Sequence, residues 1–148
     1  MDVKIKKLNP NARIPEKAHP DDFCYDVWAT SEEEIAPNIW KYGIGLAFQI
    51  LNEDDVPFYN VSLDFRPRSS IWKTGMVLAN STGTVDAGYR NEVSLIFYHL
   101  FPDMPRYKVG DKIGQMKLGS AEELGFIEVD ELNGTERGLG GFGSTGLK

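Results

Sequence analysis

The sequence GTVDAGYRNEVSLIFYHLF, residues 83–101, decides the class of fold. Its first part ends in Asp86-Ala87-Gly88-Tyr89, where two small residues stand between a carboxylate and an aromatic ring. Gly88 is free to take positive φ, so these four residues predict a tight turn. Residues 93–101 then form a continuous apolar and aromatic run that is typical of a strand buried on both faces. The stretch therefore predicts a tight turn followed by a buried strand, and a hairpin with an ordinary turn Asp is the simpler interpretation of the turn.

Alternation of apolar and polar residues recurs on both sides of this stretch. It predicts short strands near residues 3–5, 61–65, 113–118 and 126–129. No run of a dozen residues has a helical stripe, and only residues 31–34 and 121–124 could each form one helical turn. Residues 52–55 are expected to form an exposed hairpin tip. Many short strands with regular turn residues indicate a sandwich, a jelly roll or a barrel.

Length, charge and cysteine usage narrow the class of protein. At 148 residues the chain fits one domain, and its net charge of −6 repels phosphate backbones, so we expect no nucleic-acid partner. The single Cys24 cannot form an internal disulfide, which favours a reducing compartment. The N-terminus has no apolar signal region and no 18-residue apolar run occurs, so we expect a cytoplasmic protein without a membrane partner.

The composition changes after Leu132, where six of the next fourteen residues are glycine. We therefore predict a β-barrel domain over residues 1–132 and a flexible arm over residues 133–148. The arm contains Arg137, Phe142, Ser144 and Thr145, which offer one cation, one ring and two hydroxyls. These groups could close over a ligand that has an aromatic ring and phosphates, although such a segment alone is commonly a disordered tail.

Two guanidinium groups and two hydroxyls occur together in Arg66-Pro67-Arg68-Ser69-Ser70. Arginine forks suit bidentate binding of phosphate oxygens. If Ser69 caps a short helix, free backbone N–H groups would add to the anion site. Taken alone, a polar turn leaving a strand is the simpler interpretation.

Two further polar residues are candidates for a reaction site. Asp86, placed at a turn beside Tyr89, could orient and deprotonate a water molecule, although an ordinary turn Asp is the simpler interpretation. Gln115 interrupts an apolar run and must find partners if it is buried, whereas a lone Gln more often faces solvent. No spacing of Cys, His and Asp residues suggests a zinc site held by the protein.

In order along the chain, these segments resemble the five motifs of the trimeric dUTPase family. Cys24-Tyr25-Asp26-Val27-Trp28-Ala29 resembles motif one, residues 66–70 motif two and residues 83–92 motif three. Gly110-Asp111-Lys112-Ile113-Gly114-Gln115 resembles motif four, and residues 137–146 resemble motif five. The resemblance implies an all-β, jelly-roll-like β-barrel with one or two short helical turns and a mobile, glycine-rich C-terminal arm.

The resemblance also implies a reaction, the hydrolysis of dUTP to dUMP and pyrophosphate by attack of water on the α-phosphorus. Such a reaction limits uracil incorporation into DNA and supplies dUMP for thymidylate synthesis. Asp86 resembles the carboxylate that activates the water, and Tyr89 the ring that packs against deoxyribose and excludes a 2′-hydroxyl. Asn80, with the backbone of Gly83 and Val85, matches the part that reads the uracil edge.

The remaining implied residues bind phosphates or the metal ion. Phosphate ligands are implied at Arg68, Ser69, Ser70 and Gln115. The arm would add substrate-binding residues, which are Arg137, Phe142, Gly143, Ser144 and Thr145. Mg²⁺ chelated by three phosphates keeps waters and needs few protein ligands, so Asp26 is implied to act on it only through water. The implied assembly is a homotrimer whose active sites draw on more than one subunit.

Some positions depart from the family pattern. Cys24 and Asn91 stand where glycine is usual, Lys112-Ile113-Gly114 stands where Arg-Ile-Ala is common, and residues 49–65 form a longer region than usual. dCTP deaminases share the implied fold, but they use a glutamate-based site and lack the spacing of Asp86 and Tyr89. A regulatory protein that uses the nucleotide as a switch is a second alternative, and a second regulatory function stays open.

Overall fold

The computed structural model describes residues 2–51, 60–141, 144 and 146. Its ten strands and one short helix are β1 (Asp2–Lys7), β2 (Tyr25–Trp28), β3 (Glu33–Ala36), β4 (Ile39–Gly43), β5 (Leu46–Leu51), β6 (Val61–Arg66), the 3₁₀ helix η1 (Ser69–Lys73), β7 (Met76–Leu78), β8 (Gly83–Asp86), β9 (Ser94–His99) and β10 (Lys112–Ser120). The prediction of an all-β chain with one or two short helical turns is therefore confirmed, with one turn present as η1.

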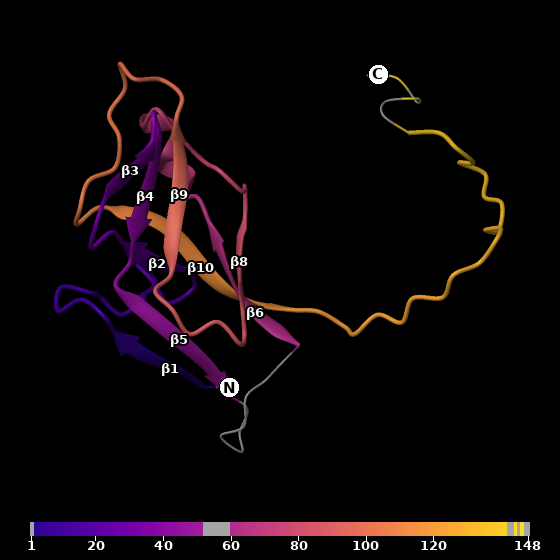
Figure 1. The fold of residues 1–148 in the computed structure, drawn as a ribbon, viewed down its shortest axis with the longest axis horizontal. Helices are drawn as coiled ribbons and strands as arrows, with labels where there is room; N and C mark the ends of the chain where they lie inside the picture. Colours follow the sequence, from indigo (N-terminus) through magenta and orange to yellow (C-terminus); the bar gives the residue numbers. More distant parts are fainter. Residues whose placement is uncertain (1, 52–59, 142–143, 145, 147–148) are drawn as a thin grey trace.

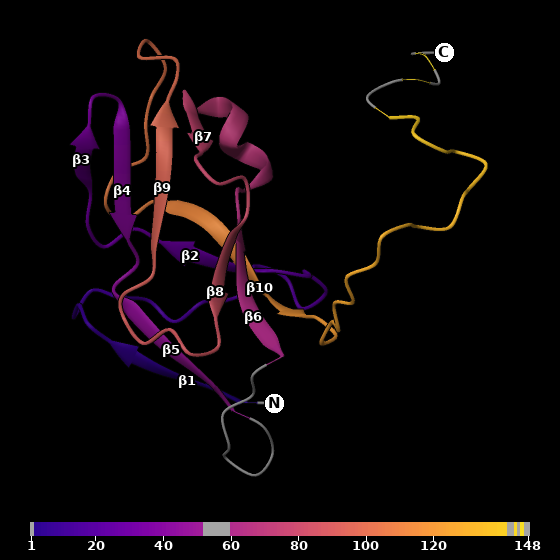
Figure 2. The same ribbon diagram turned by 45° about the vertical axis from the view of Figure 1, so that its right-hand side comes forward.

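The strands form three antiparallel sheets. One four-stranded sheet has the order β2-β10-β6-β8, the other has the order β3-β4-β9-β7, and β1 pairs with β5. Figures 1 and 2 show these sheets gathered around a common centre, without closing into a continuous barrel. The arrangement is jelly-roll-like, as predicted.

The core lies between the sheets and is built from the inward positions of the alternating patterns. On β6, Leu63 and Phe65 are buried while Ser62 and Asp64 are only half-buried. Tyr42 of β4 and Phe97 of β9 pack edge to face, with ring centroids 5.8 Å apart. Period-two alternation therefore predicted β1, β6 and β10 correctly, because a strand in such a sheet buries one face and leaves the other exposed to solvent.

The hairpin interpretation of the turn at Asp86 is wrong, and so is the predicted burial of residues 93–101 on both faces. The two strands beside the turn are present as β8 and β9, but β8 pairs with β6 whereas β9 pairs with β4 and β7. The tight turn therefore carries the chain from one sheet to the other. β9 is buried only at alternate positions, and Tyr98 remains 42% exposed. The predicted burial on both faces is thus absent within the single chain.

The chain leaves the sheets after Ser120, where β10 ends. Residues 121–141 are almost entirely exposed, and Figure 1 shows this segment running away from the sheets. The strand predicted at residues 126–129 and the helical turn predicted at 121–124 are both absent. Phe126 and Ile127 are 90% and 87% exposed, because this segment has no neighbouring strand to pair with in the single chain. The domain boundary after residue 132 stays a prediction.

One further local prediction is wrong, and another lies outside the described residues. Residues 31–34 form no helical turn, because Glu33 and Glu34 begin β3 and pair with β4. The hairpin tip predicted at residues 52–55 lies outside the described residues.

Candidate active site

A polar cluster surrounds Asp26, which is buried on β2 with an exposure of 3%. Lys112 donates to Oδ2 of Asp26 at 2.7 Å. Arg68 donates through Nε to Oδ1 at 3.2 Å, and Gln115 donates through Nε2 to the same oxygen at 3.3 Å. Pairing of β2 with β10 places Gln115 directly opposite Asp26, while Arg68 arrives from the loop after β6.

The electrostatics of this cluster favour a bound anion. Burial alone would raise the pKa of the Asp26 carboxyl, but hydrogen bonds from Lys112 and Gln115 and the charges of Arg68 and Lys112 hold that pKa below its usual value. The carboxylate is therefore ionised at neutral pH. Because two cations face one anion, the cluster retains a net positive charge beside a half-exposed arginine.

The helix that follows Arg68 adds hydroxyl groups to the cluster. Nη1 of Arg68 donates to Oγ of Ser70 at 3.3 Å, and the exposed Ser69 begins η1. Ser69 is the first helical residue, and Arg68 occupies the capping position without a side-chain hydrogen bond. The predicted serine cap is therefore wrong, whereas the grouping of Arg68 with Ser70 and Gln115 near one carboxylate is present.

The turn after β8 presents Asp86 and Tyr89. The carboxylate of Asp86 is exposed, and the backbone N–H of Tyr89 donates to the Asp86 carbonyl at 3.0 Å. A cavity of about 180 Å³ lies beside the turn, and it is lined by Thr84, Val85, Asp86, Tyr89, Val93 and Ser94. The predicted carboxylate and ring thus border one hollow.

A second cavity of about 110 Å³ lies against the start of β8. Asn80, Gly83 and Val85 are among its lining residues. The side-chain amide of Asn80 approaches Gly83 closely, since a Cβ built on Gly83 would lie 3.5 Å from Nδ2 of Asn80. Both cavities are lined by Thr84, Val85, Val93 and Ser94, so they flank β8 where it diverges from β9.

The cluster around Asp26 and the turn at Asp86 lie far apart in one chain. Asp86 pairs with Ser62, which pairs with Gly119, whereas Asp26 pairs with Gln115 four residues earlier on β10. Four residues along a strand span about 13 Å, and the three strand spacings from β2 to β8 span about 14 Å. The backbones of Asp26 and Asp86 are therefore roughly 20 Å apart on the diagonal. The single chain therefore does not bring these two groups together.

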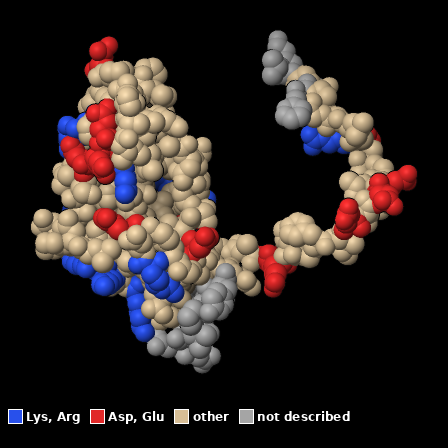
Figure 3. Space-filling model, viewed as in Figure 1, with Lys and Arg blue, Asp and Glu red and all other residues tan. Residues whose placement is uncertain are grey.

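The described residues of the arm, 133–141, 144 and 146, do not reach either group in the single chain. Arg137 is exposed and donates only locally, through Nε to the Gly140 carbonyl at 2.9 Å. Ser144 is also local, since its N–H donates to the Gly141 carbonyl at 3.0 Å. Phe142, Gly143 and Thr145 lie outside the described residues. Figure 3 shows acidic side chains spaced along the segment, and Arg137 is the sole basic residue between residues 121 and 141.

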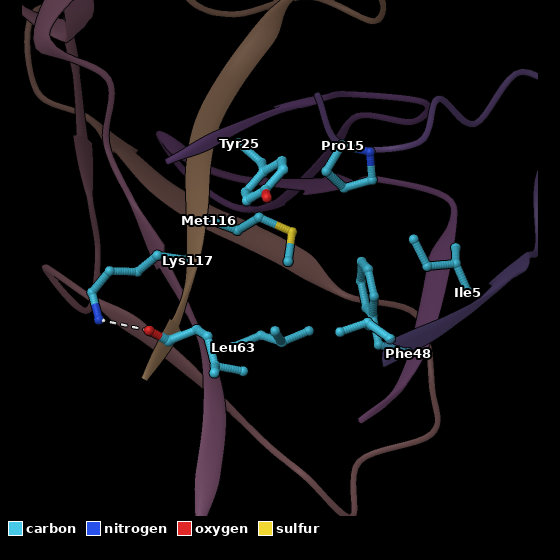
Figure 4. A pocket seen from close by; sticks show the side chains of 9 residues that line it. Ile5, Pro15, Tyr25, Phe48, Leu63, Met116 and Lys117 are labelled. Atoms are coloured by element: carbon cyan, nitrogen blue, oxygen red, sulfur yellow. Dashed lines mark hydrogen bonds between the residues drawn. The ribbon is translucent and has the colours of Figure 1, made fainter. Parts of the chain in front are cut away.

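Sequence reasoning assigned no role to Lys112, which makes the shortest hydrogen bond to Asp26. Lys112 was visible only as a departure from the family pattern. An apolar cavity of about 330 Å³ lies elsewhere, where Ile5, Phe48, Leu63 and Met116 converge from four strands (Figure 4). That cavity contains none of the predicted site residues.

Within residues 2–51, 60–141, 144 and 146, no group of three or more His, Cys, Asp and Glu side chains is placed to hold an ion. Among the same residues, no helix has the length and apolarity that crossing a membrane requires.

Comparison with known proteins identifies one family and relatives of a single kind. The family model described as dUTPase matches residues 10–146. The deoxyuridine 5′-triphosphate nucleotidohydrolase of Nautilia profundicola is 35% identical and is covered over 99% of each chain. The enzyme of the same name from Nocardia farcinica is 35% identical over 97% of this chain and 85% of its own length.

Solved structures agree in fold. The dUTPase of Staphylococcus bacteriophage 80alpha with dUPNHPP superposes with a TM-score of 0.80 at 23% identity, over 99% of each chain. A dUTPase from phage phi11 of S. aureus, described with a structural Mg(II) ion, gives a TM-score of 0.70 at 20% identity. That superposition covers 89% of this chain and 99% of the phage protein.

Proposed function

This chain belongs to the dUTPase family, and we propose that it hydrolyses dUTP to dUMP and pyrophosphate by attack of water on the α-phosphorus. One observation carries the proposal. The turn after β8 presents an exposed carboxylate, Asp86, and an aromatic ring, Tyr89, at the rim of the same cavity. A carboxylate in that position can orient and deprotonate the attacking water.

We propose that the nucleoside lies along β8. Asn80 and the backbone of Gly83 and Val85, which border the second cavity, would read the uracil edge. Reading by backbone groups rejects cytosine, because a backbone donor that meets an acceptor oxygen on uracil would meet the 4-amino donor of cytosine instead. Tyr89 would pack against the deoxyribose and occupy the space that a 2′-hydroxyl needs.

The triphosphate would bind at the cluster around Asp26. There Arg68, Ser69, Ser70 and Gln115 would contact phosphate oxygens, with Asp26 acting through its neighbours. Its hydrogen bonds to Arg68 and Gln115 hold both side chains in place before substrate arrives. Phosphoryl chemistry depends mainly on such positioning and on charge neutralisation.

We propose that the enzyme is a homotrimer with shared active sites. The separation of roughly 20 Å between Asp86 and the cluster of Asp26 supports this assembly, since the attacked α-phosphorus would lie beside Asp86 while the attached phosphates would bind beside Asp26. A neighbouring subunit can supply the missing half. The arm over residues 133–148 would then close a site, with Arg137, Phe142, Gly143, Ser144 and Thr145 contacting substrate.

The donor groups fit a Mg²⁺ ion carried mainly by the triphosphate. The oxygens of Asp26 already accept hydrogen bonds from Lys112, Arg68 and Gln115, but a carboxylate has further lone pairs that can accept from a metal-bound water. Magnesium keeps several waters and commonly uses few carboxylates with substrate phosphates. When bound, the ion would neutralise phosphate charge and hold the phosphates in one arrangement.

The proposed reaction removes a DNA precursor that contains uracil and yields dUMP for thymidylate synthesis. We infer that it takes place in the cytoplasm, in agreement with Cys24, which forms no disulfide.

Release of pyrophosphate from dUTP, dCTP, dTTP and UTP, measured side by side, tests this function. We expect release from dUTP at a kcat/KM at least about 10²-fold above the other three nucleotides. Release of ammonia from dCTP would instead identify a deaminase. Absence of pyrophosphate release from dUTP with Mg²⁺ present would refute the proposal.

A further inference from the structure

The turn that presents Asp86 and Tyr89 is held by contacts that reach into other strands. Nη1 of Arg90 donates to the carbonyl oxygens of Ala87 and Tyr89 within the turn and to that of Phe48 on β5. The hydroxyl of Tyr89 donates to the backbone carbonyl of Glu92 at 3.0 Å. The tip of the exposed ring is therefore fixed by the position of the Glu92 backbone.

Glu92 is itself anchored by its side chain. Oε1 of its carboxylate accepts the backbone N–H of Gly45 at 2.8 Å. The carboxylate fills a notch at the end of β4, because a Cβ built on Gly43 would overlap Oε1 of Glu92 and lie 2.6 Å from Oγ of Ser31. Gly43 thus leaves the space that the carboxylate occupies, and no larger residue fits there with Glu92 in place.

We propose that Glu92 is a positioning residue that sets discrimination against ribonucleotides through Tyr89. This inference rests on the proposed function, since it takes Tyr89 as the ring beside C2′ of the sugar. Tyr89 is 43% exposed, so packing alone does not hold its ring. One hydrogen bond orients it, and two contacts hold the acceptor of that bond. The Glu92 carboxylate lies in the notch formed by Gly43 and Gly45. The Val93 N–H, in the same peptide group as the acceptor, donates to the Leu46 carbonyl at 3.0 Å.

The notch requires an acceptor oxygen at the distance from the backbone that a glutamate side chain provides. Glutamine keeps an acceptor oxygen at the same distance from the backbone and can still accept the Gly45 N–H. Aspartate keeps the charge but is one methylene shorter, and alanine removes the acceptor. A side chain on Gly43 would displace both the Glu92 carboxylate and the Ser31 hydroxyl, while none of its three nearest neighbouring atoms belongs to the turn. Because misplacement of a binding group by about 1 Å costs up to about 10²-fold, small shifts of the ring should change selectivity.

The experiment compares kcat/KM for dUTP and for UTP in Glu92→Ala, Glu92→Asp, Glu92→Gln and Gly43→Ala. We expect the dUTP-to-UTP ratio to fall roughly tenfold in Glu92→Ala, Glu92→Asp and Gly43→Ala, and to stay within about twofold in Glu92→Gln. Combining Gly43→Ala with Glu92→Ala should lower the ratio no further than Glu92→Ala alone, because both remove the same contact. Asp103→Asn, in the loop at the opposite end of β9, is the matched control and should keep the wild-type ratio.

A merely structural role for Glu92 would lower the thermal midpoint and leave the ratio unchanged. An unchanged ratio in any folded variant among Glu92→Ala, Glu92→Asp and Gly43→Ala would overturn the inference. A tenfold fall in Glu92→Gln would overturn it as well, since the acceptor oxygen is retained. These outcomes are separate from the proposed function, which fails only if the wild-type protein does not hydrolyse dUTP.

Discussion

Mixing two inactive variants tests whether one active site is built from different chains. The first variant is Asp86→Asn with its arm intact, and the second is truncated after Asn133 with Asp86 intact. Each should be nearly inactive alone, because one lacks the proposed base and the other lacks Arg137 and the groups beyond it. Both should still assemble, since the described part of the deleted segment packs against no sheet.

The expected recovery follows from the geometry and from random mixing. Seventeen residues separate Ser120, the end of β10, from Arg137, and extended chain spans about 3.3–3.6 Å per residue. Arg137 can therefore lie about 56–61 Å from the end of β10, well beyond the roughly 20 Å between the two halves of the candidate site. In an equal random mixture, half of the chains carry an intact Asp86 and the other half carry an intact arm. The two parts are drawn independently if they come from different chains. About one site in four is then complete, and activity should return to about a quarter of the wild-type value.

The assay is release of pyrophosphate from dUTP by co-expressed chains with two different tags. Purification on both tags in sequence removes the unmixed trimers and should raise the recovery to about a third of the wild-type value, because every mixed cyclic trimer then has one complete site in three. The control mixes full-length Asp86→Asn with truncated Asp86→Asn, which should stay inactive because no chain carries the proposed base. If verified mixed assemblies recover no activity, each chain closes its own site and the shared-site model is wrong.

Three further predictions concern single residues. Asp86→Asn keeps the shape of the side chain but cannot accept a proton, so kcat should fall by roughly 10²–10⁴ while a non-hydrolysable dUTP analogue still binds in calorimetry; more than half of wild-type kcat would remove Asp86 from the mechanism. Tyr89→Ala should lower kcat/KM for dUTP and relax rejection of UTP, and an unchanged ratio between the two substrates would assign that selectivity elsewhere. The pKa of Asp26 is lowered in the folded state, so its contribution to stability is present above the unfolded pKa of about 3.9 and is lost as pH falls through the lower folded pKa. Thermal midpoints measured from pH 6 to pH 2.5 should therefore fall less steeply below about pH 4 in Asp26→Asn than in wild type; parallel curves would contradict this assignment.

The positions of several strands could be predicted from local sequence alone. Alternation over Leu63 and Phe65 marks β6, and the small residues Ala87 and Gly88 mark the turn before Tyr89. These features depend on neighbours in the chain, because a pleated strand repeats every two residues and a tight turn needs residues that fit its dihedral angles. For the same reason the chain was recognisable as a member of its family from short motifs.

Pairing partners were beyond local sequence. The pattern of residues 126–129 is that of a strand, yet Phe126 and Ile127 are exposed because a strand forms only where another edge accepts its hydrogen bonds. Likewise, the turn after Asp86 looks like a hairpin in the sequence, but it joins strands of two different sheets. Register and sheet membership are long-range properties that no window of residues contains.

The sequence by itself determined an all-β chain with a carboxylate and a ring at one turn and with clustered arginine and serine residues elsewhere. Only the tertiary structure decided that Lys112, far along the chain, contacts Asp26, and that Glu92 occupies the notch beside Gly43. It also decided that Asp86 and Asp26 stand roughly 20 Å apart in one chain. The physical reason is that each residue carries its own side-chain chemistry, whereas the distances between strands arise from the hydrogen-bond register of whole sheets.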